Sequence, residues 1–257
     1  MAAPSKRWLP LEANPDVMNQ ERHLLSARNS FYLMMLMQFI WGLGVPEEEV
    51  EFNDVYGLDE ELLEMVPKPV LAVMFLFPYT AQIEAERKAD REQDSTEKKE
   101  SGKKVYFLKQ TVGNACGTIG ILHALGNATS EINLVEGSYF DRFYKSTANM
   151  DPYERAAFLE KDREMEDAHS VAATAGDTEE SFMSLMGGSS NRYLMVLHHL
   201  VACCSKLKLK KGVTLAYAFA MRLEPDLKDA AKVIKTMIQK IPDSMNFNVM
   251  ALSKKEK

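Results

Sequence analysis

Eight consecutive apolar residues, Val70 to Phe77, lie between two prolines, Pro69 and Pro78. The length of this run and its flanking prolines favour a buried strand over a helix. Apolar residues make up 46% of the 257 residues, which is enough for a core in one large domain or two small ones. The run therefore predicts a strand inside the core of a folded domain.

Other segments carry local signals for helices and strands. Asp151 followed by Pro152 predicts a capped helix that continues to about Glu166. Residues 117–125 read as a helix that ends at Gly126-Asn127. Pro225-Asp226 begins a last helix with one apolar face, and 246–252 predicts a terminal strand buried on both faces.

The segments between these elements are more polar. Residues 84–104 are almost all charged or small, which predicts a solvated linker. Residues 105–107 predict a short strand or an extended entry to the helix that follows. Residues 168–180 are small and polar, so we expect a mobile loop there. The apolar stretch 193–204 fits either a buried strand or a buried helix.

Charge and cysteine content exclude several classes of protein. A formal net charge of −6 argues against nucleic acid and against an acidic membrane surface as partners, and it favours a basic partner surface. The apolar stretch 31–45 contains Gln38 and is shorter than the roughly 20 residues of a membrane span, and the start shows no signal-peptide core. Three cysteines without metal-ligand spacing indicate a cytoplasmic or nuclear protein with no metal or cofactor.

The segment from Gln110 to Ala124 carries the candidate chemistry. Cys116 lies where an extended segment meets the predicted helix, so its thiol faces N–H groups and the positive end of the helix dipole. Both effects are expected to lower the pKa of the thiol and to enrich the nucleophilic thiolate. The Gln110 amide and the Cys116 backbone N–H could form an oxyanion hole. His123, roughly 10 Å further along the helix, is a poor base and is predicted to be structural.

A lone cysteine among small residues is most often a buried small hydrophobe, but the spacing around this one is specific. Gln110, Asn114, Cys116, Gly117 and His123 resemble the signature of the ubiquitin C-terminal hydrolases. The resemblance extends from Trp8 to Lys255 except in two segments. Its other matching stretches are 8–15, 54–59, 70–78, 150–156 and 246–253.

This resemblance implies a fold of the α/β (α+β) class in a single domain over 1–257. A central antiparallel sheet would be flanked by helices, as in papain-like cysteine peptidases, with a knotted backbone. Cys116 would attack the carbonyl of the C-terminal glycine of ubiquitin, and Gln110 would hold the oxyanion. A histidine would act as base and an aspartate would orient it. Residues 151–180 would form a loop that crosses above the cleft, and the partner would be ubiquitin, bound by a monomer.

Two segments depart from the family pattern. Residues 21–38 look inserted, and we expect either a disordered surface loop or an apolar helix laid on the domain. The block 181–224 replaces the strand with the catalytic histidine and the Leu-Asp-Gly-Arg stretch that follows it. The family pattern stops and resumes abruptly at the ends of this block, which suggests an alternative transcript or a mis-joined gene model.

The second departure decides the candidates for the base. His198 and His199 are the only histidines of the replaced block, and only one of them can face the cleft if they lie on a strand. Residues 181–223 contain no Asp or Glu to orient either one. His169 resembles a loop histidine of the family without a catalytic role, and Asp226 reads as part of a helix cap.

Three hypotheses follow from this pattern. The first is a working thiol-dependent hydrolase that releases small adducts or peptides from the C-terminal glycine of ubiquitin. The second is a ubiquitin-binding protein with impaired catalysis, because the histidine and the aspartate of the family are missing from their places. The third is a chain that does not fold stably. Labelling by a ubiquitin probe with a C-terminal electrophile separates the first hypothesis from the other two.

Overall fold

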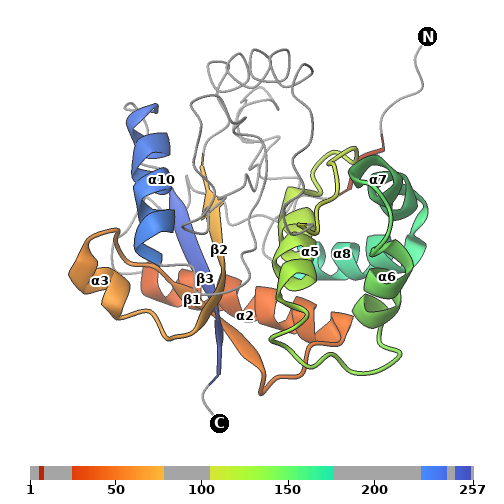
Figure 1. Cartoon of the computed structure of the whole chain (residues 1–257), viewed down its shortest axis with the longest axis horizontal. Coiled ribbons are helices and arrows are strands. Elements are labelled where there is room, and N and C mark those ends of the chain that lie inside the picture. The colour runs from red at the N-terminus through yellow and green to blue at the C-terminus, as the bar shows by residue number, and fades with distance from the viewer. Residues whose placement is uncertain (1–5, 9–24, 78–104, 176–226, 242–246, 256–257) are drawn as a thin grey trace.

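The computed structural model describes residues 6–8, 25–77, 105–175, 227–241 and 247–255 (Figure 1). Helices and antiparallel strands share this part of the chain, so the predicted α+β class is confirmed. The knotted backbone stays a prediction, because a test of it requires residues outside these ranges. The elements in chain order are α2 (Leu25–Leu43), β1 (Val50–Asp54), α3 (Glu60–Glu64), β2 (Val70–Leu76), α5 (Cys116–Ala128), α6 (Tyr139–Thr147), α7 (Pro152–Lys161), α8 (Arg163–Ala175), α10 (Leu227–Gln239) and β3 (Asn248–Lys254).

Within the described residues the strands form one antiparallel sheet in the order β1–β3–β2. The C-terminal strand β3 is therefore central, with Phe52 of β1 opposite Leu252 and Met74 of β2 opposite Met250. Residues 249–253 of β3 are all buried. This confirms the terminal strand predicted from residues 246–252, and its central position explains why both of its faces are apolar.

Helices cover both faces of β2, which explains its unbroken apolar run. Every residue of β2 is buried. Met74 and Leu76 belong to the core cluster that also contains residues of α2 and α5, whereas Val73 and Phe75 belong to the cluster that contains residues of α10. Successive side chains of a strand point to opposite faces, so the two clusters alternate from Ala72 onward, after the irregularity between Val70 and Ala72. Figure 1 shows α3 and α10 on one side of the sheet and α5 to α8 on the other.

The segment expected as an insertion, 21–38, contributes to helix α2. The helix packs against β1 and α8, and Leu36 and Ile40 have no exposed surface. Of the two predicted forms, loop or apolar helix, the described residues from Leu25 onward take the helix. Because α2 has buried neighbours on more than one side, its sequence shows no narrow apolar stripe. Whether the segment is an insertion in the family stays a prediction.

Helix α5 is longer than the sequence predicted. It continues through Gly126 and Asn127 to Ala128, so the expected end at Gly126-Asn127 is wrong. Both residues instead contact Tyr106. A Cβ atom on Gly126 would lie 2.1 Å from Cδ1 of Tyr106, and the Asn127 side chain pairs with the backbone N and O of Tyr106, at 2.8 Å each. Residues 105–107 form neither a strand nor a helix, so the predicted short strand is absent there.

The helix predicted from Asp151 to Glu166 is two helices. Asp151 caps α7 in a capping box with Glu154, which confirms the predicted start. Asp162 then leaves the helical conformation and accepts a hydrogen bond from the Met165 N–H, so α8 begins there. The mobile loop expected over 168–180 is wrong as far as Ala175, because these residues complete α8. Residues 151–175 therefore form helices, and the rest of the predicted crossover loop lies outside the described residues.

The last predicted helix is confirmed as α10. Leu227, Ala230, Ile234 and Met237 are buried on the face that packs against the sheet. The predicted linker 84–104 and the apolar stretch 193–204 lie outside the described residues.

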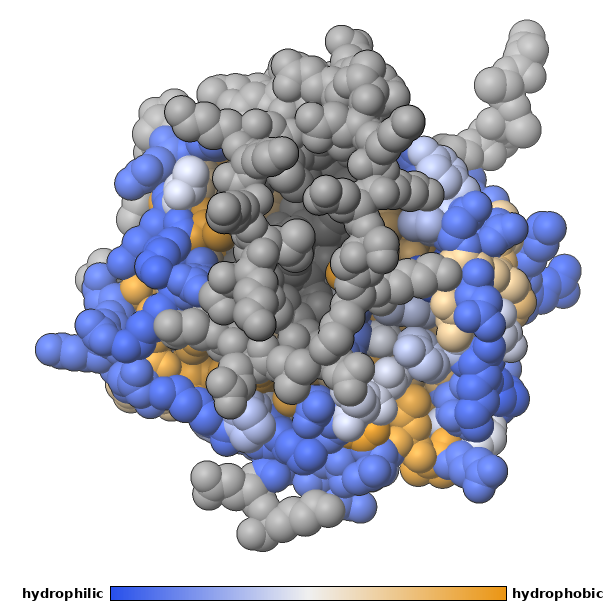
Figure 2. All heavy atoms as spheres, viewed as in Figure 1, coloured by the Kyte–Doolittle hydropathy of each residue, from blue (hydrophilic) through white to orange (hydrophobic). Residues whose placement is uncertain are grey.

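Polar residues cover most of the described surface in the view of Figure 2, and the hydrophobic residues there form small separate areas. None of the described helices is long and apolar enough to cross a membrane.

Candidate active site

A tight turn directly precedes Cys116. Asn114 takes a left-handed backbone conformation, with φ of 61°, and Asn is among the few non-glycine residues that tolerate it. Its side-chain amide donates to the backbone O of Trp8 at 3.0 Å. The neighbouring Gly113 exchanges backbone hydrogen bonds of 2.9 Å with Lys6 and Trp8. The N-terminal segment thus holds the turn that leads into α5.

Cys116 is the first residue of α5 and is buried. The residue before it, Ala115, has no side-chain oxygen to cap the helix, although capping residues are strongly preferred at this position. The positive end of the helix dipole is therefore not offset by a capping side chain and faces the position of the thiol. Only 4% of the Cys116 surface is exposed.

Gln110 lies on the extended segment that leads to this turn and is half-buried. Its Nε2 donates to the backbone O of Val112 at 3.2 Å. A primary amide carries two N–H donors, so this bond uses one of them. The segment itself is fixed from two sides, since Arg155 donates to the O of Phe107 at 2.7 Å and His123 contacts Leu108.

His123 has the structural role predicted for it. It is buried in α5, and its Nε2 lies 3.1 Å from the backbone N and also 3.1 Å from the backbone O of Leu108. Burial is the main cause that lowers the pKa of His123 to about 3. The imidazole is therefore neutral at physiological pH and connects α5 to the segment that carries Gln110.

A second buried histidine meets the same end of α5. His169 of α8 has no exposed surface, and its Nδ1 lies 2.7 Å from Oγ1 of Thr118. Its ring also packs against Trp8, with ring centroids 4.8 Å apart. The sequence predicted a loop residue here. Thr118 and His169 are 51 residues apart, and no local pattern in the sequence pairs them.

The remaining candidates lie outside the described residues. They are the two candidates for the base, His198 and His199, and Asp226. Among the residues that the structure describes, no cluster of His, Cys, Asp or Glu could hold a metal ion.

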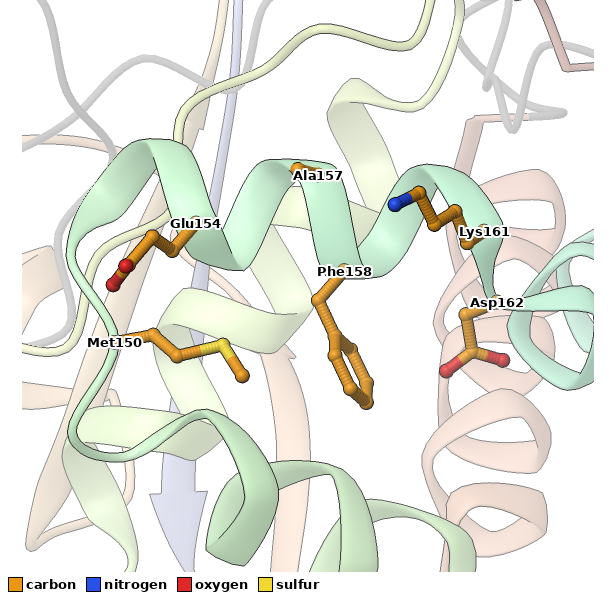
Figure 3. A pocket seen from close by; sticks show the side chains of 6 residues that line it. All are labelled: Met150, Glu154, Ala157, Phe158, Lys161 and Asp162. Atoms are coloured by element: carbon orange, nitrogen blue, oxygen red, sulfur yellow. The ribbon is translucent and has the colours of Figure 1, made fainter.

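A hollow of about 540 Å³ opens beside α7, and no candidate catalytic residue lines it. Figure 3 shows Phe158 and Met150 projecting into the same space below the helix. The lining residues are Met150, Glu154, Ala157, Phe158, Lys161 and Asp162.

Comparison with known families decides the assignment. The family model described as ubiquitin carboxyl-terminal hydrolase, family 1, matches residues 33–202. This chain belongs to that family. The match includes residues 33–38 and 181–202, which are parts of the two segments that seemed to depart from the pattern.

Relatives in the family align over nearly the whole chain. Ubiquitin carboxyl-terminal hydrolase 3 of Arabidopsis thaliana is 52% identical, over 98% of this chain and 96% of its own length. A probable ubiquitin carboxyl-terminal hydrolase of Dictyostelium discoideum is 34% identical, over 97% and 89%. Human isozyme L1 is 31% identical, over 95% and 97%. These enzymes are cysteine peptidases, and this chain has the cysteine at the start of α5.

A solved structure supports the fold. The catalytic domain of UCH37 from Trichinella spiralis, bound to ubiquitin vinyl methyl ester, matches with a TM-score of 0.58. The match covers 97% of this chain and 96% of that chain at 17% sequence identity. The similarity confirms the predicted fold of a ubiquitin C-terminal hydrolase.

Proposed function

We propose that this chain is a thiol-dependent hydrolase that cleaves small adducts or peptides from the C-terminal glycine of ubiquitin. One observation carries the proposal: Cys116 is the first residue of α5, directly after the left-handed turn at Asn114, in a chain of this family. A thiol at a helix N-terminus is a common arrangement for a reactive cysteine. The solved structure of similar fold from Trichinella spiralis is bound to ubiquitin vinyl methyl ester.

In the proposed reaction, the base takes the proton of the Cys116 thiol, and the thiolate attacks the carbonyl carbon of the glycine. The oxyanion that forms accepts hydrogen bonds from the Gln110 amide and the Cys116 backbone N–H. The intermediate collapses to a thioester, and the leaving amine takes a proton from the base. A water molecule, which gives its proton to the same base, then hydrolyses the thioester. The proposed base is either His198 or His199.

The proposed partner follows from charge as well as from family. The net charge of −6 suits the basic C-terminal tail of ubiquitin, and opposite charges accelerate encounter. We propose that the chain acts as a monomer, in the cytoplasm or the nucleus, without nucleic acid, membrane or cofactor.

Reaction with ubiquitin vinyl methyl ester tests the assignment of the nucleophile. The wild-type chain should form a covalent adduct that mass spectrometry places at Cys116, and Cys116→Ala should bind ubiquitin without forming it. Cys203→Ser and Cys204→Ser are matched controls that should react as the wild type does. An adduct at either of these cysteines, or equal labelling of Cys116→Ala, would contradict the proposal.

The same chain, assayed on a ubiquitin C-terminal reporter, decides between hydrolysis and binding alone. Turnover that depends on Cys116 supports the hydrolase. Ubiquitin binding without turnover supports the alternative, a protein with impaired catalysis. The reason to consider this alternative is that residues 181–223 contain no Asp or Glu.

A further inference from the structure

Two buried polar side chains meet at the first turn of α5. Thr118 is the third residue of the helix and His169 belongs to α8, and neither has any exposed surface. Oγ1 of Thr118 lies 2.7 Å from Nδ1 of His169. A buried polar pair is costly unless its geometry is satisfied, and an apolar pair of similar volume is often as stable. The pair therefore indicates that α5 and α8 must be held in one defined orientation relative to each other.

The imidazole of His169 is held from a second side. Its ring packs against the indole of Trp8, with centroids 4.8 Å apart and planes at 44°. The backbone of Trp8 donates to the O of Gly113 at 2.9 Å and accepts from the Asn114 side chain at 3.0 Å. One histidine thus contacts the helix turn that carries Cys116 and the segment that holds the turn before it.

We propose that His169 is a positioning residue for Cys116, a role that rests on the proposed hydrolase function. Through Thr118 it fixes the rotation of the first turn of α5, and through Trp8 it supports the bend at 113–114. The direction of the Cys116 thiol depends on both, because Cys116 lies between them in the chain. A misplaced nucleophile is costly, since even a shift of about 1 Å can lower a rate by about 100-fold.

Matched substitutions at Thr118 separate positioning from packing. Thr118→Val keeps the shape and removes the hydroxyl, whereas Thr118→Ser keeps the hydroxyl and removes a methyl group. With a ubiquitin C-terminal reporter, kcat of Thr118→Val should fall about tenfold, the equivalent of one neutral hydrogen bond, while KM stays within about twofold. Thr118→Ser should stay close to the wild type in both. Equal losses in the two variants would overturn the proposal.

The double variant Thr118→Val with His169→Leu gives the sharper test. Replacing both partners by apolar groups removes the hydrogen-bonding pair as a unit, so the melting temperature should recover relative to Thr118→Val alone. If His169 positions the nucleophile, kcat should remain low in this stable protein. Recovery of kcat together with the melting temperature would show that the pair serves packing only, and would overturn the proposal.

A readout that needs no ubiquitin keeps this test independent of the proposed function. Alkylation by iodoacetamide is followed at the Cys116 peptide by mass spectrometry, apart from Cys203 and Cys204. The rate should be lower in Thr118→Val and in the double variant than in Thr118→Ser. If the wild-type chain neither turns over the reporter nor reacts with the ubiquitin probe, the hydrolase function fails, and the alkylation rates still decide. Equal rates in all variants would then overturn the positioning role.

Discussion

Single residues set the geometry around Cys116. Asn114 supplies the left-handed bend, and Ala115 leaves the helix start without a side-chain cap. Gln110 precedes this bend in the chain, and its amide donates to the O of Val112. Each of these residues has a local task that can be tested by one substitution.

Gln110→Ala should lower kcat by about 10²–10³, as removal of one oxyanion donor does elsewhere, with little change in KM. The reason is that the donor acts on charge that develops only in the transition state. Steady-state kinetics on a ubiquitin C-terminal reporter measure both constants. A rise in KM with unchanged kcat would show instead that Gln110 only binds substrate.

Acidification should destabilise the protein through His123. Its pKa is lowered to about 3 in the folded chain, whereas an unfolded histidine titrates near about 6.5. Between these values the unfolded chain binds a proton that the folded chain does not. The contribution of neutral His123 to the free energy of unfolding should therefore be complete above about pH 6.5. It should decrease as the pH falls towards 3, by at most about 1.4 kcal/mol per pH unit.

Denaturant titrations of the wild type and His123→Gln over this pH range measure the effect. The variant should be less stable at neutral pH, because a buried contact with Leu108 changes, but its stability should fall less steeply with acid. Parallel pH profiles would mean that His123 does not cause the slope.

At the scale of elements, the structure differs from the sequence predictions mainly in where helices begin and end. Helix α5 continues through a glycine and an asparagine because Tyr106 packs on one and pairs with the other. Helices α7 and α8 separate at Asp162, whose carboxylate also accepts from the Tyr139 hydroxyl at 2.6 Å. Burial and hydrogen bonding of these residues override the local signal for starting or ending a helix.

The cap of α7 gives a prediction at this scale. The Asp151 carboxylate accepts from the N–H groups of Tyr153 and Glu154 at 2.7 and 2.9 Å. Asp151→Ala should reduce the free energy of unfolding by about 1 kcal/mol. Asp59→Ala is a matched control, because Asp59 precedes α3 without forming a side-chain cap bond, and it should leave stability nearly unchanged. Equal effects in thermal or denaturant unfolding would contradict a specific role of the cap.

The whole molecule brings distant segments together on both faces of one sheet. Residues of β3, at the C-terminal end, separate β1 from β2, and helices from the middle of the chain cover one face while α10 covers the other. The N-terminal segment reaches the turn before Cys116 and also the far helices, since Lys6 pairs with Glu166 at 2.7 Å. The candidate site is thus assembled from parts of the chain that are more than 100 residues apart.

Net charge belongs to this scale as well. Because the chain is acidic, association with ubiquitin should slow as salt rises from about 0.01 to about 1 M, over which the screening length falls from about 30 to about 3 Å. Stopped-flow measurements of the association rate test this, and dissociation should change less. An association rate that is independent of salt would argue against electrostatic steering.

Patterns in the sequence alone determined the buried strand at 70–77, the central C-terminal strand, the capped start of α7 and the place of Cys116 at a helix start. Each depends on near neighbours or on the one-dimensional order of apolar residues. Only the tertiary structure decided that residues 168–175 are helical and that α5 continues past Gly126. It also decided that His169 meets Thr118, 51 residues away. Contacts between distant segments supply the free energy for these features, so no local pattern encodes them.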